Sequence, residues 1–206
     1  MKNLFFLYST IFFYISICLF TFAGCEKYPE KIQANLNKLK STNSCSGCDL
    51  TGVDLVGFDL KNVDLSGFAN LGSADLTNAN LANANLTDAN LSDADLTGAN
   101  LTGANLTDAN LTNITLINAN LTGAILTGGF ANLSRADLTK ANLAGANLAG
   151  ANLTGANLSG ANLTGANLTG ANLTDANLTN ITLINANLTG AILNDGQFSL
   201  LESSGL

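Results

Sequence analysis

Leucine recurs at every fifth position through most of this chain, and that period limits what the chain can fold into. On an α-helix, five residues turn about 500°, so successive leucines would lie about 140° apart and form no stripe. On an unbroken strand, an odd period sends alternate leucines to opposite faces. Only a short extended piece with a corner every five residues keeps all of them inside. The leucine position, here called i, runs in steps of five from Cys45 to Leu65, from Leu71 to Leu126 and from Leu133 to Leu193, and ends at Phe198.

The other positions of the repeat fit this geometry. Position i−2 is mostly Ala and lies two residues before the leucine, so both side chains point inward on one side of a coil. Position i−1 is mostly Asn or Asp, and i+1 is mostly Thr or Ser. Position i+2 is mostly Gly, Asp or Asn, which tolerate the backbone angles of a corner. Stacked coils would place Asn over Asn and Thr over Thr, about 4.8 Å apart, as side-chain ladders.

This pattern resembles the pentapeptide-repeat family over about residues 43–198, and the segment Leu39–Leu50 also resembles a frequent opening segment of that family. The resemblance implies an all-β fold, a right-handed quadrilateral β-helix with four repeats in each coil. Thirty-one repeats would then make nearly eight coils. We therefore expect a pentapeptide-repeat solenoid over residues 43–201, followed by a tail at 202–206.

The register slips twice, once by one residue and once by two. Each slip is either a bulged corner, in which glycine supplies backbone freedom, or a loop that protrudes toward a partner. Both slips carry Gly and Phe, as Gly67-Phe68 and Gly128-Gly129-Phe130.

Part of the chain is duplicated: residues 96–126 recur identically as residues 163–193. The offset equals thirteen repeats plus the two-residue slip. Because thirteen is not a multiple of four, the two copies should lie one side apart around a square coil. Such drift in repeat number argues against a site that needs one fixed position.

The first 24 residues have the pattern of a signal peptide, with one positive charge followed by an apolar run. The end of this run, Phe22-Ala23-Gly24-Cys25, resembles a bacterial lipobox, in which the chain is cut before the cysteine and the cysteine is lipidated. We therefore expect a lipid anchor on Cys25 and a place in the bacterial cell envelope. Glu26 is not the Asp that retains enteric lipoproteins at the inner membrane, so the outer membrane is favoured. The run is also long enough to span a bilayer, so an uncleaved anchor helix is the alternative.

Residues 25–42 form a tether between the anchor and the repeats. Pro29 suits the first turn of a helix, and Ile32, Leu36 and Leu39 form one apolar stripe at helical spacing. The pattern predicts a short helix that caps the first coil, as the ends of solenoids require. A basic spacer that lies on anionic headgroups is the alternative. At the far end, three apolar residues should cover the last coil: Phe198, Leu200 and Leu201.

Composition excludes several kinds of chemistry. The chain has no His, which removes Ser-His-Asp triads, Cys-His pairs and imidazole metal ligands. Eight basic and fifteen acidic residues give a net charge of −7, which disfavours binding to nucleic-acid phosphates. Four consecutive i−1 carboxylates should ring the first coil instead of stacking into a calcium cage: Asp49, Asp54, Asp59 and Asp64.

Cys45-Ser46-Gly47-Cys48 is the one motif with potential covalent chemistry in the repeat region. Both cysteines fall on the inward register, so they could be small apolar fillers. The alternative is a disulfide that locks the first coil, which is plausible outside the cytoplasm. A single C-x-x-C without a second pair or a His is weak evidence for a metal or redox site. We predict no catalytic, cofactor or metal-binding residue.

These observations predict a non-enzymatic, membrane-anchored structural or protein-interaction module. Its expected partners are the membrane, through the lipid anchor, and an unidentified protein, with no nucleic acid. A homodimer through the solenoid ends is left open. The resemblance also implies an alternative, a DNA-mimicking protein that binds DNA gyrase, because some family members are acidic rods. Export through the signal peptide would keep this chain away from gyrase.

Overall fold

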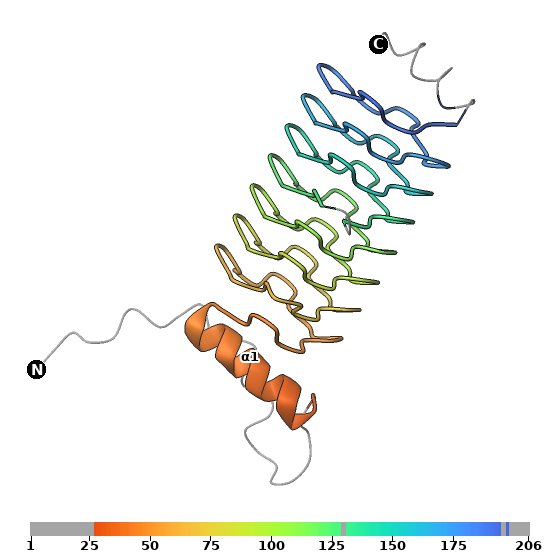
Figure 1. Cartoon of the computed structure of the whole chain (residues 1–206). Coiled ribbons are helices and arrows are strands. Elements are labelled where there is room, and N and C mark those ends of the chain that lie inside the picture. The colour runs from red at the N-terminus through yellow and green to blue at the C-terminus, as the bar shows by residue number, and fades with distance from the viewer. Residues whose placement is uncertain (1–26, 129–130, 195–196, 198–206) are drawn as a thin grey trace, which may run out of the picture.

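The computed structural model describes residues 27–128, 131–194 and 197, and forms a rod of stacked coils with one helix across its N-terminal end (Figure 1). The helix, α1, spans Glu30–Thr42, which confirms the short helix expected from the sequence. Within the described ranges, no helix has the length and apolarity needed to cross a membrane. The expected signal peptide, Cys25 and the tail lie outside the described residues.

Parallel β-bridges join residues that are 20 apart in sequence, as between Asn80 and Asn100, so each coil contains four repeats. The spacing becomes 21 where a bridge crosses the first slip, and 22 where it crosses the second. All bridged residues from Asp49 onward occupy position i−1 and fall into four columns, one along each side of the rod. We name each side by its first bridged residue: the Ser44 side, the Asp49 side, the Asp54 side and the Asp59 side.

Isolated bridges hold the sides of the described rod. None of these bridges extends into a strand of several residues. The extended piece in each repeat is this short because a corner begins directly after the leucine. Asn100 illustrates the pattern. Its N–H donates to the preceding coil at Ala79, and its C=O accepts from the same coil at Leu81. The flanking residues of Asn100 make the equivalent pair of bonds to the following coil.

The repeat formed by residues 101–105 gives a partner to every one of its backbone N–H groups, as burial requires. Three N–H groups donate to neighbouring coils, one closes the corner turn, and one donates to the side chain of the preceding Asn. In chain order the bonds are Leu101 to Asn120 O (2.7 Å), Thr102 to Asn100 Oδ1 (3.1 Å), Gly103 to Thr122 O (2.9 Å), Ala104 to Leu101 O (3.0 Å) and Asn105 to Ala84 O (2.9 Å).

The backbone conformation of the corners explains why position i+2 is mostly Gly, Asp or Asn. These residues have positive φ, for example 68° at Gly98 and 57° at Asn113. Together with the hydrogen bond from i+3 to i, a positive φ at the third residue is typical of type II turns. Gly adopts this conformation without steric cost, and Asn and Asp tolerate it better than other residues.

The core is a single stack of leucines and alanines along the rod axis. Leu158 and Ala156, in the middle of the described rod, are both 0% exposed. This burial confirms that positions i and i−2 point inward. Burying one such leucine contributes on the order of 1.5–3 kcal/mol before the cost of ordering the chain is subtracted.

Helix α1 covers the first coil and supplies hydrogen bonds that a preceding coil would otherwise make. Its Leu36 and Leu39 are buried against the core. Three polar side chains in and beside α1 bond to backbone groups of the first coil. Asn35 Nδ2 donates to Asp49 O (2.8 Å), Asn43 Nδ2 donates to Lys61 O (3.2 Å), and Tyr28 Oη accepts from the Asp54 N–H (2.9 Å).

Both register slips lie at the same corner, between the Ser44 side and the Asp49 side. The first falls between Asp64 and Asn70, and the second between Ile125 and Asn132. Because both sides continue their bridges after each slip, an added residue is accommodated at the corner without breaking the stack.

The two copies of the duplicated segment lie one side apart, as expected. Thr115 is on the Asp54 side, whereas its counterpart Thr182 is on the Asp59 side. The same sequence therefore forms the same local structure on different sides of the rod.

A charge placed in the core tests the inward register. We expect Leu158→Asp to lower the free energy of unfolding by more than about 4 kcal/mol, because it buries an unpaired carboxylate and leaves a cavity. Gly145→Asp is the matched control, since Gly145 occupies a corner with φ +65° and open space around a Cβ. Chemical denaturation followed by circular dichroism measures both variants. Equal stability of the two variants would contradict the register.

Candidate interaction surface

The outer surface of the rod is built largely from ladders of asparagine side chains. The amide of one Asn donates to the side-chain oxygen of the Asn one coil before it, as from Asn162 Nδ2 to Asn142 Oδ1 (3.1 Å). The same contact recurs along the Asp49 side, from Asn90 to Asn70 and from Asn110 to Asn90. The expected stacking of Asn over Asn is therefore confirmed, and it binds successive coils together through their side chains as well as their backbones.

Threonine behaves differently from the sequence expectation of a Thr ladder. In most repeats its hydroxyl donates to the Asn of its own repeat, as from Thr164 Oγ1 to Asn162 Oδ1 (2.6 Å). The physical reason is proximity, because the Asn oxygen already accepts the N–H of the same Thr (3.1 Å). Such local side-chain bonds compete with longer-range ones. These hydroxyls are therefore bonded within the rod.

Acidic residues concentrate on one side of the rod. As expected, Asp49, Asp54, Asp59 and Asp64 lie on four different sides and ring the first coil. The Asp54 side continues with stacked carboxylates in the next coils, a feature that the repeat spacing did not predict. This column consists of Asp54, Asp75 and Asp95, then Thr115, then Asp137.

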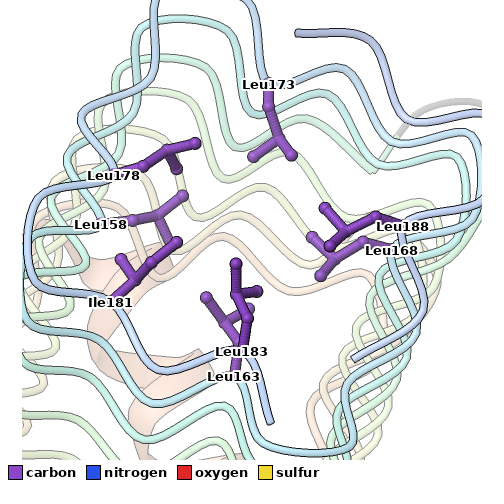
Figure 2. A pocket seen from close by; sticks show the side chains of 8 residues that line it. All are labelled: Leu158, Leu163, Leu168, Leu173, Leu178, Ile181, Leu183 and Leu188. Atoms are coloured by element: carbon purple, nitrogen blue, oxygen red, sulfur yellow. The ribbon is translucent and has the colours of Figure 1, made fainter. Parts of the chain in front are cut away.

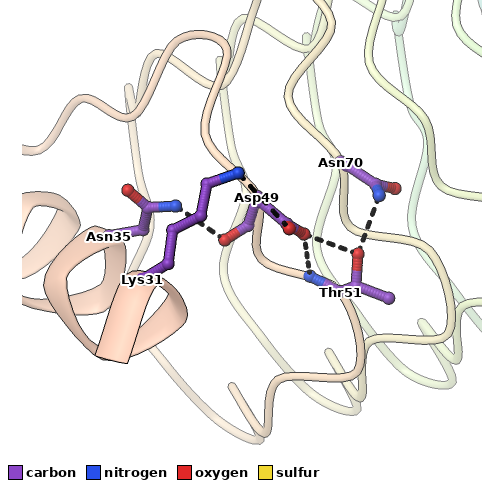
Figure 3. Close-up of polar contacts among 5 residues, drawn as sticks. All are labelled: Lys31, Asn35, Asp49, Thr51 and Asn70. Atoms are coloured by element: carbon purple, nitrogen blue, oxygen red, sulfur yellow. Dashed lines mark hydrogen bonds and ion pairs between the residues drawn. The ribbon is translucent and has the colours of Figure 1, made fainter. Parts of the chain in front are cut away.

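The carboxylates of the first coil are held by neighbouring donors. The Lys27 ammonium, 2.8 Å from Asp54 Oδ2, holds the pKa of that carboxyl below its ordinary value. The hydroxyl of Thr51 does the same to the pKa of Asp49, which also lies 4.0 Å from Lys31 Nζ (Figure 3). The contacts of Lys27 and Lys31 join the chain around α1 to the first coil.

Cys45 and Cys48 form a disulfide in the structure, with their Cα atoms 5.2 Å apart. Both cysteines are buried, and Cys48 Sγ lies 3.9 Å from Lys38 Nζ. The bridge closes the first corner of the rod directly beneath α1. Among the described residues, no group of three or more His, Cys, Asp or Glu could hold a metal ion.

Leucine and alanine side chains fill the core of the described rod. A cavity of about 10 Å³ lies among leucines of the last coils, including Leu168, Leu173 and Leu188 (Figure 2). Such a volume holds at most one water molecule, and its walls are apolar.

Phe68 is the most exposed large apolar side chain among the described residues, at 77%. It is the added residue of the first slip, and both it and Gly67 have positive φ, 66° and 62°. The Ala69 N–H donates to Ser66 O (3.3 Å) and closes a four-residue turn of type I′ character around them. The slip is thus a bulged corner, and its extra side chain projects into solvent. The corresponding Phe130 lies outside the described residues.

This four-sided rod of five-residue repeats defines a solenoid of the β-helix class. A family model for pentapeptide repeats matches eight copies, over residues 44–67, 68–103, 104–129, 131–170 and 166–200. The chain therefore belongs to the pentapeptide-repeat family, whose fold is a right-handed β-helix.

Several solved structures are similar to this chain. HetL, a pentapeptide repeat protein involved in heterocyst differentiation regulation from the cyanobacterium Nostoc sp. strain PCC 7120, is 40% identical, with a TM-score of 0.46 over 74% of this chain and 75% of HetL. Rfr23 from the cyanobacterium Cyanothece 51142 is 31% identical, with a TM-score of 0.31 over 79% of this chain and 99% of Rfr23. QnrB1, a plasmid-mediated fluoroquinolone resistance protein, is 21–22% identical in three structures, with TM-scores of 0.36–0.38 over 78% of this chain and 90–92% of QnrB1. A comparison with curated proteins gives no match.

Two substitutions at Asn162 separate its roles as acceptor and donor. Asn162→Asp keeps the oxygen that accepts from Thr164 but loses the bond to Asn142, so we expect a loss of about 1 kcal/mol in unfolding free energy. Asn162→Ala loses all three bonds, and we expect a loss of about 2–3 kcal/mol. Urea denaturation at neutral pH measures both. An Ala variant as stable as the parent would show that the ladder contributes nothing.

Phe68 is in a backbone conformation that suits Asn or Gly better than an aromatic residue. We expect Phe68→Asn to raise the free energy of unfolding by about 1 kcal/mol, because Asn tolerates positive φ and little buried surface is lost. Asn already occupies this region elsewhere, as at Asn78 with φ 58°. Urea denaturation of the variant beside the parent measures the change. A destabilised variant would mean that the Phe68 side chain packs against the rod.

Proposed function

We propose that this protein is a non-enzymatic, membrane-anchored module that presents a rigid rod to a protein partner in the bacterial cell envelope. The proposal assigns the lipid to Cys25 and the contact surface to the sides and corners of the rod. The outer membrane is its favoured location, and nucleic acid is not among its proposed partners.

The observation that carries the proposal is the internally bonded surface. In the Asn ladders, side-chain oxygens accept hydrogen bonds from their own repeat and from the next coil. The ladders are therefore held in one conformation before any partner binds. Binding to such a surface loses little conformational entropy in the rod itself. Phe68 adds a projecting aromatic side chain of the kind that often anchors protein interfaces.

The N-terminal end suits attachment to a membrane. Cys25 precedes Lys27 by two residues, and the Lys27 ammonium bonds to Asp54 in the first coil. Two residues span at most about 7 Å. A lipid on Cys25 would therefore hold the end of the rod close to the bilayer, with the Asn rows accessible from the sides.

The acidic column on the Asp54 side favours a second candidate, a DNA-mimicking protein that binds DNA gyrase. Its four carboxylates lie on one side, three of them in successive coils and the fourth, Asp137, two coils further on. Beyond Asp137 the same side carries Asn157 and Asn177, so the acidic stretch is short. Export of the chain would also separate it from gyrase, and the membrane module is therefore the preferred proposal.

Metabolic labelling with an alkyne-tagged fatty acid in a bacterial host tests the anchor directly. We expect label on the parent protein and its recovery in the membrane fraction. Cys25→Ala should lose the label, because the lipidated thiol is gone. Cys18→Ala is the matched control, since Cys18 lies within the proposed signal peptide, and it should keep the label.

An unlabelled parent protein in the soluble cytoplasmic fraction would overturn the membrane proposal. The gyrase candidate would then lead, and inhibition of purified gyrase by the chain would be the next assay. Label that persists in Cys25→Ala would place the lipid on another residue.

A further inference from the structure

Two basic residues occupy corners of the rod whose backbone conformation does not suit them. Arg135 and Lys140 have φ of 58° and 56°, in the left-handed region. The other described residues with positive φ are Gly, Asn, Asp or Ser, apart from Phe68. Long side chains are uncommon in this region because the Cβ atom crowds the carbonyl oxygen. Strain of this kind at an exposed position indicates a role other than folding.

Neither cation forms an ion pair within the described part of the chain. Both are exposed, and the two ion pairs found there belong to the chain around α1. Their stems lean over glycine corners of the next coil. A Cβ added at Gly155 would lie 3.9 Å from Arg135 Cγ, and one added at Gly160 would lie 3.3 Å from Lys140 Cγ. Arg135 and Lys140, here called the basic pair, therefore stand at the two corners that border the Asp54 side.

Two exposed carboxylates occupy the same region of the rod two coils earlier. Asp93 lies at the same corner as Arg135, with Asn113 between them in the stack, and Asp95 follows on the Asp54 side itself. Each carboxylate uses one oxygen within the rod. Asp93 Oδ1 accepts from Asn113 Nδ2 (3.1 Å), and Asp95 Oδ1 accepts from Thr97 Oγ1 (2.6 Å). Asp93 and Asp95, here called the acidic pair, form no ion pair with a described residue.

The two pairs match each other when two copies of this side meet in antiparallel orientation. A two-fold axis across the side reverses the direction of the rod and sets each corner opposite the same corner of the second copy. Because the basic stems lean toward the next coil, the axis that brings them onto the acidic pair lies between the coils of Thr115 and Asp137. Asp137 then faces Thr115 of the second copy instead of a carboxylate. Parallel rods would set like charges against each other.

We propose that the Asp54 side binds a second copy of this chain in antiparallel orientation, with the basic pair of each copy on the acidic pair of the other. This contact uses a side of the rod and is distinct from association through its ends. The seven bridged residues of the side span only about 30 Å at 4.8 Å per coil, so the interface is small. The pairing is therefore weak and sensitive to salt.

Antiparallel pairing points the two N-terminal ends in opposite directions. Two lipid-anchored copies would therefore belong to two facing bilayers. The pairing itself depends on the four charges and not on the lipid, so it can be tested whether or not Cys25 is modified.

Sedimentation equilibrium of the full chain tests the pairing from about 10 μM to 1 mM, the range of weak interfaces. A non-ionic detergent disperses the apolar N-terminal run and leaves the charges unscreened. One variant combines Arg135→Asn with Lys140→Asn, and the other combines Asp93→Asn with Asp95→Asn. Asn suits the positive φ at three of these positions. At the fourth, Asn keeps the oxygen that accepts from Thr97, so both variants should fold.

The matched control combines Asp59→Asn with Asp88→Asn. Asp59 lies on the next side of the rod, and Asp88 lies at the corner between the Ser44 side and the Asp49 side. The control and the acidic-pair variant each make the chain less negative by two charges, so general repulsion between copies falls equally in both. Only the acidic-pair variant should lose the pairing.

We expect the parent and the control to dimerise, and the apparent dissociation constant of each pair variant to rise at least about tenfold. Raising the salt to about 500 mM should weaken the parent dimer in the same direction. An equimolar mixture of the two pair variants should associate more tightly than either alone, because one of the two contacts is intact. A parent that stays monomeric at every concentration would overturn the proposal. An acidic-pair variant that dimerises as tightly as the control would overturn it as well.

Discussion

The structure depends on the hydrogen bond between successive coils, made at the single residue before each leucine. That residue bonds through its N–H and C=O to the coil beneath, and the corner residue at i+2 adds another bond along the axis. One N–H in each repeat, at i+1, is left without a backbone partner. The Asn or Asp side chain accepts it, as Asn100 does from Thr102, and this requirement explains why the surface of the rod is dominated by one residue type.

At both ends of the described rod, side chains make hydrogen bonds that a further coil would otherwise make. Backbone groups of the first coil bond to the side chains of Tyr28, Asn35 and Asn43. At the other end, a backbone carbonyl accepts from the side chain of Gln197. An uncapped coil would leave a row of backbone groups and an apolar interior open to solvent or to another chain. Helix α1 covers the N-terminal end, so the proposed partner would bind the sides of the rod. There the Asp54 side, Phe68 and exposed isoleucines such as Ile184 depart from the Asn surface.

The inward leucines, the corners, the helix before the repeats and the Asn ladders could all be predicted from the sequence, because each depends on spacing within five residues or within one coil. The acidic column on the Asp54 side was harder to predict. Asp54 and Asp75 are 21 residues apart, and their alignment depends on which corner accommodates the residue added at the first slip. The hydrogen-bond partner of the Thr hydroxyls was not predicted, because a local acceptor competes with the neighbouring coil. The contacts of Tyr28 and Gln197 depend on proximity in space, and no spacing rule signals them. Cys25 lies outside the described residues, and its lipidation stays a prediction.

The central claim is that the repeat of five, and not any particular side of the rod, specifies this fold. Comparing two deletions tests it most directly. Removing residues 156–160 deletes one whole repeat and rotates the following coils by one side, which the duplicated segment already tolerates. Removing residues 156–161 leaves three residues between Leu153 and Leu163 in place of the usual four, too few to turn a corner. The account predicts that the first variant unfolds cooperatively within about 5 °C of the parent, whereas the second loses more than about 10 °C or its cooperativity. Equal melting of the two variants, or a greater loss in the first, would contradict it.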